Sequence, residues 1–241
     1  MIDVHSHILP GIDDGSQDLE ESIQMAKEAY KAGFTDVIAT SHYIEESYST
    51  SKSKREELIC QLQERLEQEG ININIHNGAE AYITPNLDEL IRTEKLATIN
   101  NTRYLLMELP MHSKIIYLDN IISDLIGQGV IPIIAHPERY SYVQKNPKIL
   151  IDLIEAGVLF QANYGSIIGE YGKEAEKIIK KLLKGNRIHF LGTDCHRESS
   201  VYIQMPQILK KLEKLIGKDK LELLSRINPQ KVLNDADIKI N

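Results

Sequence analysis

The 241-residue sequence has few cysteines, no long hydrophobic run and no excess of positive charge. Its two cysteines, Cys60 and Cys195, cannot make a disulfide framework, which fits a reducing cytoplasm. No apolar run approaches about 18 residues and no secretory signal is visible, so we expect a cytoplasmic protein without a membrane span. The formal net charge of −7 argues against general nucleic-acid binding, because such surfaces are usually basic.

Apolar and charged residues are present in ordinary proportions, 42% and 26%, which is typical of a globular chain. Short buried segments alternate with amphipathic stretches along the whole chain. We expect strands at 1–4, 34–40, 73–83, 103–109, 130–136, 158–163 and 187–193. We expect helices at 16–32, with Ser16 as its cap, at 52–69, and around 115–127, 147–155, 170–184 and 203–216.

Strands that alternate with helices indicate βαβ units and a mostly parallel sheet. No Pro-, Gly- or Ser-rich linker divides the chain, so we expect a single α/β domain over residues 1–241. Seven predicted strands suit a closed or nearly closed barrel resembling a TIM barrel. In such barrels functional residues gather at the carboxyl ends of the strands.

Side chains that bind metals stand where these predicted strands end. Each has an ordinary explanation when taken alone, since His-x-His arises by chance and carboxylates at strand ends often face solvent. Their joint placement at ends that a parallel barrel brings together predicts a metal site. The residues are His5, His7, His42, Glu80, Glu108, His136, Asp194 and His196.

Local spacing supports this prediction at the first strand. Residues two apart in an extended chain point to the same side, so His5 and His7 face one site while Ser6 faces away. The following loop, closed by glycines, carries Asp13 and Asp14, and an aspartate there can reach over the same rim. The residues alone do not choose between these two carboxylates.

The last predicted strand repeats the arrangement. Asp194 and His196 face the site, and Cys195 between them is turned away. Neither cysteine begins a Cys-x5-Arg loop, which excludes a cysteine phosphatase mechanism. The remaining histidines do not fall at strand ends, and we expect them to be structural: His76, His112 and His189.

Five imidazoles and four carboxylates are more ligands than one ion needs, so the site predicts two or three metals that share ligands. Four carboxylates carry a charge of −4. Two divalent ions would leave the site neutral, and three would leave it positive, which a phosphate dianion prefers. Nitrogen and oxygen ligands without a thiolate suit manganese, iron or zinc.

Several motifs resemble a known family. They are MIDVHSHILPGIDDGSQDLEESIQMAKEA, IATSHY, GAEAYITP, LLMELP, IAHPERY, QANYGSIIG, LGTDCH and, near the C-terminal end, NPQKVL. Together they resemble the polymerase-and-histidinol-phosphatase (PHP) superfamily. Within it they are most similar to the bacterial tyrosine-protein phosphatases of capsule and exopolysaccharide operons, the CpsB/CapC type.

The resemblance implies a distorted (β/α)7 barrel with a three-metal centre that usually contains manganese. It selects Asp14 over Asp13, and it implies that Arg139 in HPERY holds the substrate phosphate. The family often places a second arginine where this chain has Val201, so Arg197 is a candidate substitute. The implied metal ligands are His5, His7, Asp14, His42, Glu80, Glu108, His136, Asp194 and His196.

The family's implied substrate is phosphotyrosine on the C-terminal tail of a membrane-associated bacterial tyrosine kinase that controls polysaccharide export. Some members form rings that dock this kinase, so a homo-oligomer is plausible. The predicted reaction is metal-assisted hydrolysis of a phosphate monoester, in which Arg139 neutralises developing charge. Asp194, His196 or water protonates the leaving group.

Three other functions fit parts of this pattern. Histidinol phosphatase would use the same centre, and only the pocket and substrate tests separate it. An amidohydrolase also begins with His-x-His, but it commonly places a bridging lysine at a middle strand end, where this chain has glutamates. A non-catalytic regulatory module predicts eroded ligands, whereas all nine are present.

Overall fold

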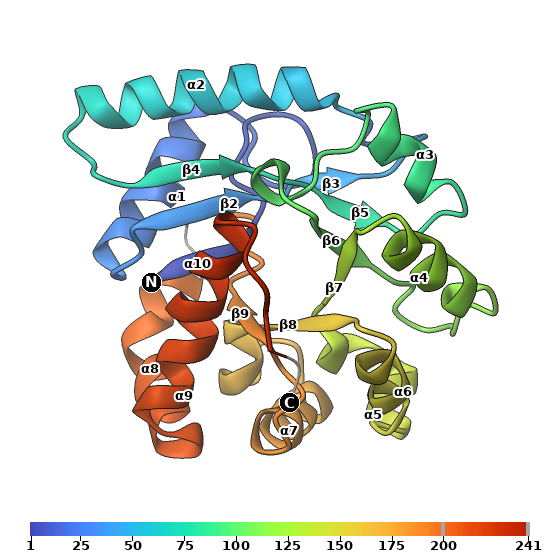
Figure 1. Ribbon diagram of the computed structural model, residues 1–241. Coiled ribbons are helices and arrows are strands. Elements are labelled where there is room, and N and C mark those ends of the chain that lie inside the picture. The colour runs from blue at the N-terminus through green and yellow to red at the C-terminus, as the bar shows by residue number, and fades with distance from the viewer. Residues whose placement is uncertain (199–200, 240–241) are drawn as a thin grey trace.

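The computed structural model describes residues 1–198 and 201–239 and contains two parallel sheets (Figure 1). The first has the strand order β1 (Ile2–Ser6), β2 (Asp36–Ala39), β4 (Asn74–Asn77). The second has the order β3 (His42–Tyr43), β5 (Glu80–Tyr82), β6 (Tyr104–Glu108), β7 (Ile131–Ala135), β8 (Leu159–Asn163), β9 (Phe190–Gly192).

The two sheets join into one ring of strands. β3 follows β2 just beyond the strand predicted at 34–40, and β4 and β5 are two parts of the strand predicted at 73–83. Across these breaks the Thr40 amide donates to the Ser6 carbonyl at 2.9 Å, and the Glu80 amide donates to the Thr40 carbonyl at 3.0 Å. A parallel bridge between Ser6 and Cys195 closes the ring. The expected distorted barrel with seven strand positions is confirmed.

Two apolar clusters follow from the alternation of side chains along the strands. Leu106, Ile133 and Phe190 lie in an inner cluster with Val232 of α10 (Asn228–Leu233). The alternate strand residues, Met107 among them, pack in a larger cluster with the surrounding helices. The inner cluster therefore fills the barrel and leaves polar side chains for the carboxyl ends of the strands.

Helix α1 (Leu19–Lys31) begins later than predicted. Its N-cap is Asp18, whose side chain accepts from the Glu21 amide at 2.9 Å. Ser16 is buried and its hydroxyl contacts Ser22 at 2.8 Å, so the prediction that Ser16 caps this helix was wrong. Ser16 and Asp18 are both possible caps. Asp18 caps the helix because its side-chain oxygen reaches a free backbone amide of the first turn.

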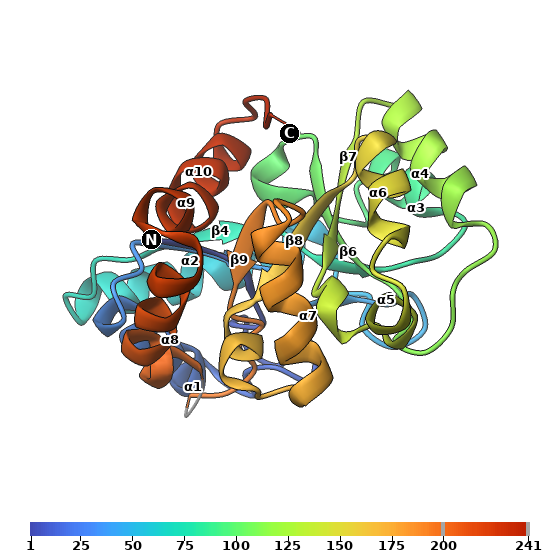
Figure 2. The same ribbon diagram turned by 90° about the horizontal axis from the view of Figure 1, so that it is seen from below.

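The long helices agree with the prediction to within a few residues, whereas α3, α5, α9 and α10 were not predicted. Figure 2 shows α4 and α6 on one side of the strands and α8, α9 and α10 on the other. None of the helices in the described part of the chain is long and apolar enough to cross a membrane. The remaining helices are α2 (Lys52–Gln68), α3 (Leu87–Arg92), α4 (Leu118–Gly127), α5 (Ser141–Lys145), α6 (Ile149–Glu155), α7 (Lys173–Lys184), α8 (Val201–Ile216) and α9 (Lys218–Glu222).

Candidate metal centre

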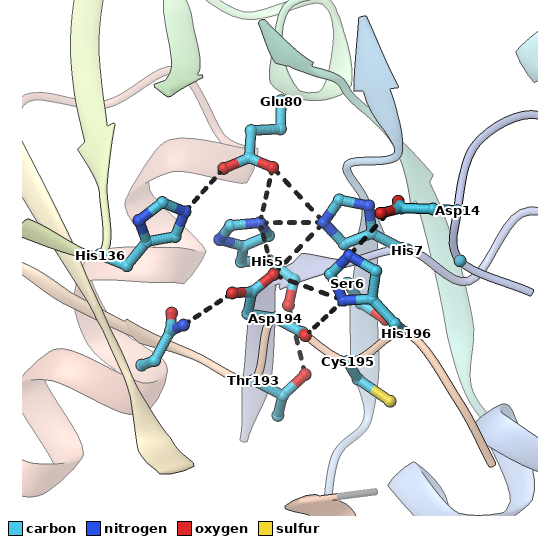
Figure 3. Close-up of polar contacts among 12 residues, drawn as sticks. His5, Ser6, His7, Asp14, Glu80, His136, Thr193, Asp194, Cys195 and His196 are labelled. Carbon is cyan, nitrogen blue, oxygen red and sulfur yellow. Dashed lines mark hydrogen bonds and ion pairs between the residues drawn. The ribbon is translucent and has the colours of Figure 1, made fainter. Parts of the chain in front are cut away.

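Four predicted ligands meet at the carboxyl end of the barrel (Figure 3). His5 lies in β1 and His7 directly follows it, Glu80 begins β5, and Asp194 follows β9. His5 Nε2 lies 3.2 Å from His7 Nε2, 3.3 Å from Glu80 Oε2 and 3.4 Å from Asp194 Oδ1. His7 Nε2 lies 3.4 Å from each of the same two carboxylate oxygens. Four ligand atoms therefore surround one small volume.

The register of β1 explains how His5 reaches this volume. Val4 belongs to the inner apolar cluster, and His5, the next residue, also points inward toward the site. The pairing of β1 with β2 shifts register between Asp3 and Ser6. Such an irregularity re-aims the side chains that follow it.

A second group of ligands lies nearer to solvent. Asp14 Oδ1 is 3.7 Å from His42 Nε2 and 3.5 Å from His196 Nε2. The rings of His7 and His196 stack with centroids 3.8 Å apart. Ligand atoms of these four residues all lie within 4.8 Å of one another, so they could hold an ion.

A third group lies on the other side of Glu80. His136 Nε2 is 3.1 Å from Glu80 Oε1 and 3.6 Å from Glu108 Oε1. His42 Nδ1 is 3.1 Å from Glu80 Oε2 and 4.0 Å from Glu108 Oε2. Glu80 thus contacts ligands on both sides, as a carboxylate shared between ions would. Glu80 opens β5 rather than ending a strand, because the predicted strand breaks before it at Gly78.

The residues present fit bound metal ions. Within the described chain, Glu80 Oε2 and His42 Nδ1 are buried and have no hydrogen-bond partner, although they lie 3.1 Å apart. Buried polar atoms are costly unless they are satisfied. Lone pairs that converge without a proton between them are satisfied when a cation occupies the point that they face.

Electrostatics point the same way. Burial opposes a charge on His5, but the Glu80 and Asp194 carboxylates outweigh it and raise the pKa of His5 to about 9. Burial and the neighbouring Glu80 raise the pKa of Glu108 to about 7. Burial alone would raise the pKa of Asp194, but the adjacent His5 and His7 hold it well below its usual range. Buried carboxylates beside imidazoles favour positive charge in this volume. Divalent cations would supply that charge in place of protons.

Backbone strain marks two of the predicted ligands. His136 has φ +34°, and Asp194 has φ +56°, both in the left-handed region that residues other than glycine rarely adopt. Each follows directly or closely after a strand, β7 and β9 respectively. Such conformations cost energy and persist where the surrounding structure holds them, often at functional sites.

Asp13 and Asp14 have different places in the first loop. Asp14 lies between His42 and His196, whereas Asp13 lies behind the site. His7 Nδ1 donates to Asp13 Oδ2 at 2.7 Å, and the His42 amide donates to the same oxygen at 2.8 Å. Burial opposes the charge on Asp13, but these donors lower its pKa to about 2. Asp13 orients ligands, a role that sequence reasoning missed.

The predicted phosphate-binding residue borders this cluster. Arg139 Nη1 donates to Asp194 Oδ2 at 2.6 Å, and its guanidinium lies 4.4 Å from the centre of the Tyr171 ring. A cavity of about 430 Å³ is lined by Arg139, Tyr171, Asp194, His196 and Arg197, among others. Tyr171 was not predicted, since an aromatic residue in a loop gives no signal of the arginine that it covers.

Arg197 lines the same cavity but is engaged elsewhere. Its Nη1 donates to the Gly15 carbonyl and lies 3.7 Å from Glu21 Oε2. Val201, at the position of the family's second arginine, is buried at the start of α8. One guanidinium nitrogen of Arg197 is therefore held at the Gly15 carbonyl, as one of Arg139 is held at Asp194.

The other histidines bond outside the cluster. His76 Nε2 lies 2.9 Å from Asp36 Oδ1, and His189 Nδ1 accepts from the Phe160 amide at 3.0 Å. His112 is exposed and accepts from the Ser141 hydroxyl through its backbone carbonyl. The sulfur of Cys195 points away from the histidines in Figure 3, and it bonds to the Arg197 carbonyl at 3.3 Å.

Comparison with known proteins identifies the family. The family model "Capsular polysaccharide synthesis, CpsB/CapC" matches residues 1–234. The chain is 35% identical over 219 residues to tyrosine-protein phosphatase YwqE of Bacillus subtilis (strain 168), across 91% of this chain and 86% of that one. It is 31% identical over 240 residues to tyrosine-protein phosphatase CpsB of Streptococcus pneumoniae, across 98% and 99%.

Solved structures agree. Crystal structures described as YwqE from Bacillus subtilis and CpsB from Streptococcus pneumoniae, unique metal-dependent tyrosine phosphatases, include a chain that matches with a TM-score of 0.94. That match has 33% identity and covers 100% of this chain and 97% of that one. Histidinol phosphate phosphatase from Lactococcus lactis, at 17% identity, 93% and 94% coverage and a TM-score of 0.60, shares the fold. The chain therefore belongs to the CpsB/CapC family of capsular polysaccharide synthesis.

Proposed function

We propose that this protein is a metal-dependent protein-tyrosine phosphatase. The observation that carries the proposal is the convergence of the nine predicted ligands, with Glu80 in their middle, beside a cavity that Arg139 lines. Relatives that match nearly the whole chain are named tyrosine-protein phosphatases, which supports the same reaction. We treat residues 1–241 as one phosphatase domain.

The proposed centre holds three divalent ions, preferably manganese, with iron or zinc as alternatives. Three overlapping groups of ligand atoms support this number, and the absence of a thiolate supports these metals. Bound ions would supply a water of lowered pKa and neutralise charge on phosphoryl oxygens. The residues that would hold them are His5, His7, Asp14, His42, Glu80, Glu108, His136, Asp194 and His196.

The chain's own side chains position the phosphate. Arg139 offers a planar fork of donors to phosphate oxygens, and Tyr171 stacks on the guanidinium and limits its motion. Arg197 is a candidate second phosphate contact, through the guanidinium nitrogens that do not bond to the Gly15 carbonyl. Asp194 and His196 border the same cavity, so either of them, or water, protonates the leaving tyrosine oxygen.

The proposed substrate is phosphotyrosine on the tail of a membrane-associated bacterial tyrosine kinase that controls polysaccharide synthesis. The family's link to capsular polysaccharide supports this assignment. A cytoplasmic location and a homo-oligomer that docks the kinase belong to the same proposal. A flexible tail suits a cavity that opens at the rim of the barrel, since an extended peptide can reach it.

A turnover assay tests the reaction. Purified protein is offered a phosphotyrosine peptide, a phosphoserine peptide and histidinol phosphate, each with manganese and each with a chelator. We expect manganese-dependent release of phosphate, fastest from the phosphotyrosine peptide. Activity that survives chelation would refute the metal mechanism, and a strong preference for histidinol phosphate would refute the tyrosine-phosphatase assignment.

An amidohydrolase remains less consistent with the site. Its bridging lysine would stand at a middle strand, where this chain has Glu80 and Glu108. No cysteine is among the ligand groups of the described residues. Protein that binds metal but releases no phosphate from any of the three substrates would contradict the phosphatase assignment and favour this alternative.

A further inference from the structure

A chain of buried side-chain hydrogen bonds lies behind the metal centre and joins two of its ligands. Asn163 Nδ2 donates to Asp194 Oδ2 at 2.7 Å, and Gln161 Nε2 donates to Asn163 Oδ1 at 2.9 Å. Gln161 Oε1 lies 2.9 Å from His5 Nδ1. Gln161, Asn163 and His5 are completely buried, so no solvent exchanges with these bonds.

Chemistry fixes the direction of every bond in this chain. Asp194 Oδ2 also accepts from Arg139 Nη1 and therefore acts as an acceptor, so the amide nitrogen of Asn163 must face it. The Asn163 oxygen is then left for Gln161, which must donate with its own nitrogen. The Gln161 oxygen therefore faces His5 and can only accept. His5 must donate through a proton on Nδ1.

The result bears on the other nitrogen of His5. With a proton on Nδ1, the Nε2 atom of the neutral ring carries a lone pair, and Nε2 faces Glu80 Oε2 and His7 Nε2. This is the tautomer that a metal ligand needs, and a hydrogen bond at the second ring nitrogen is what selects it. Asp194 is oriented by the same chain, because Asn163 and Arg139 occupy Oδ2 and leave Oδ1 toward the ligands.

We propose that Gln161 and Asn163 are positioning residues of the metal centre, which together hold His5 in its Nδ1–H tautomer and turn Asp194 Oδ1 toward the ions. The inference rests on the metal centre proposed above. Gln161 and Asn163 are not themselves among the proposed ligands, and neither is proposed to touch the substrate.

The surrounding structure leaves room for this pair of amides and anchors it. A Cβ atom on Gly192 would lie 2.8 Å from Gln161 Nε2 and 2.7 Å from His5 Cβ, so a larger residue would displace both. The backbone amide of Asn163 donates to Glu138 Oε1 at 2.8 Å, and the Ser166 hydroxyl donates to the same oxygen at 2.7 Å. The end of β8 is therefore held where Asn163 must stand.

Zinc is the probe for the experiment, because it is diamagnetic and accepts imidazole ligands. Protein labelled with 15N-histidine is titrated with Zn2+ against a competing chelator, and ring signals are recorded in the loaded state. In Gln161→Met and Asn163→Leu, apolar side chains of similar shape replace the amides. We expect Zn2+ affinity to fall about 10- to 100-fold, which is typical for loss of such supporting bonds. We expect the protected His5 Nδ1–H signal of the wild type to disappear in Gln161→Met.

Two further variants serve as matched controls. Gln161→Glu keeps an acceptor for His5 Nδ1–H but loses the amide that donates to Asn163 Oδ1, so it should retain the His5 signal and lose less Zn2+ affinity than Gln161→Met. Asn228→Ala removes a buried amide that donates to the His189 carbonyl at 2.9 Å, away from the ligands. It should lower stability and leave Zn2+ affinity unchanged.

The outcomes separate the two proposals. Wild-type protein that binds no Zn2+ would refute the metal centre itself. Wild-type protein that binds Zn2+ while Gln161→Met and Asn163→Leu bind it equally well would refute the positioning role alone. If Gln161→Met does not fold, Gln161→Glu decides, because loss of the His5 signal in that variant overturns the acceptor role.

Discussion

The inner and outer ligands of the proposed metal centre are held in different ways. The inner group, His5, His7 and Glu80, is completely buried, and the second ring nitrogen of each histidine has a fixed partner. The outer group is Asp14, His42 and His196. The side chain of Asp14 is 53% exposed and that of His196 is 31% exposed.

This difference teaches which part of the site is preorganised. Inner ligands stand in place before any ion arrives, since burial and hydrogen bonds have already removed their freedom. Outer ligands lie at the rim, where water competes for them and Asp14 must lose motion to bind. We therefore expect inner ions to bind tightly and an outer ion to exchange readily.

The variant His7→Ala should have the largest effect on activity. His7 faces inner carboxylates and stacks on outer His196, so its loss affects both groups. We expect kcat to fall about 10³-fold, corresponding to roughly 4 kcal/mol of lost metal assistance, while circular dichroism shows a folded barrel. Exposed His112→Ala is the control and should be unchanged. Near-normal activity of His7→Ala would show that the metal site is placed wrongly.

The next effect compares two arginines on one cavity. Arg139 contacts Asp194 and Tyr171, whereas Arg197 is bound to the Gly15 carbonyl. We expect Arg139→Lys to lose about 10²-fold in kcat/KM, because an ammonium cannot replace the planar fork. Arg197→Ala should lose less than about tenfold. Equal losses measured on a phosphotyrosine peptide would show that both arginines hold the phosphate.

A milder change tests the outer group alone. Asp14→Asn removes one charge from a half-exposed ligand and leaves the contacts of Glu80 intact. Activity should fall at limiting manganese and recover with excess manganese, whereas Glu80→Gln should not recover. The measurement is activity as a function of metal concentration. Recovery of both variants, or of neither, would contradict the division into inner and outer ligands.

The smallest expected effect comes from His189, a buried histidine outside the ligand cluster. It tests whether burial without a neighbouring carboxylate lowers the pKa of a histidine. His5 among carboxylates has its pKa raised, whereas burial without a carboxylate lowers the pKa of His189 to about 4. A folded pKa below the unfolded value near 6.5 means that unfolded protein binds more protons between these limits. His189 therefore contributes stability above about pH 6.5, and this contribution is lost as pH falls toward about 4.

The variant His189→Gln keeps an acceptor for the Phe160 amide without a titrating ring. Between pH 7 and pH 5, metal-free wild type should lose on the order of 2 kcal/mol more unfolding free energy than the variant. Denaturant titrations at the two pH values, with chelator present, measure this difference. Identical losses would show that His189 is accessible to protons in the folded state.

The barrel could be predicted because strand and helix periodicities differ and because the ligands recur at one end of the strands. The breaks in strand pairing before His42 and Glu80 could not be predicted, because the pattern of apolar residues does not show where two strands stop pairing. The helix start at Leu19 was misplaced because Ser16 and Asp18 are both capping residues, and only the three-dimensional contacts choose between them.

Site residues divided in a similar manner. The candidate ligands could be proposed from the sequence because imidazoles and carboxylates at strand ends are rare together, and the choice of Asp14 came from the family motif. Gln161, Asn163 and Tyr171 had no such signal in the sequence. Amide and aromatic side chains are common, and the contacts that these three make with one another or with Arg139 appear only in the folded structure. Asp13 was visible as a turn former, and its bond to His7 was not.

The bridge between Ser6 and Cys195 has a consequence for synthesis of the protein. A ribosome makes His5 and His7 first and must then translate most of the chain before Asp194 and His196 emerge beside them. Ions that bind only the assembled ring stabilise finished molecules and give nothing to truncated translation products. If the proposed centre binds metal, loading would thus distinguish a completed chain from an interrupted one.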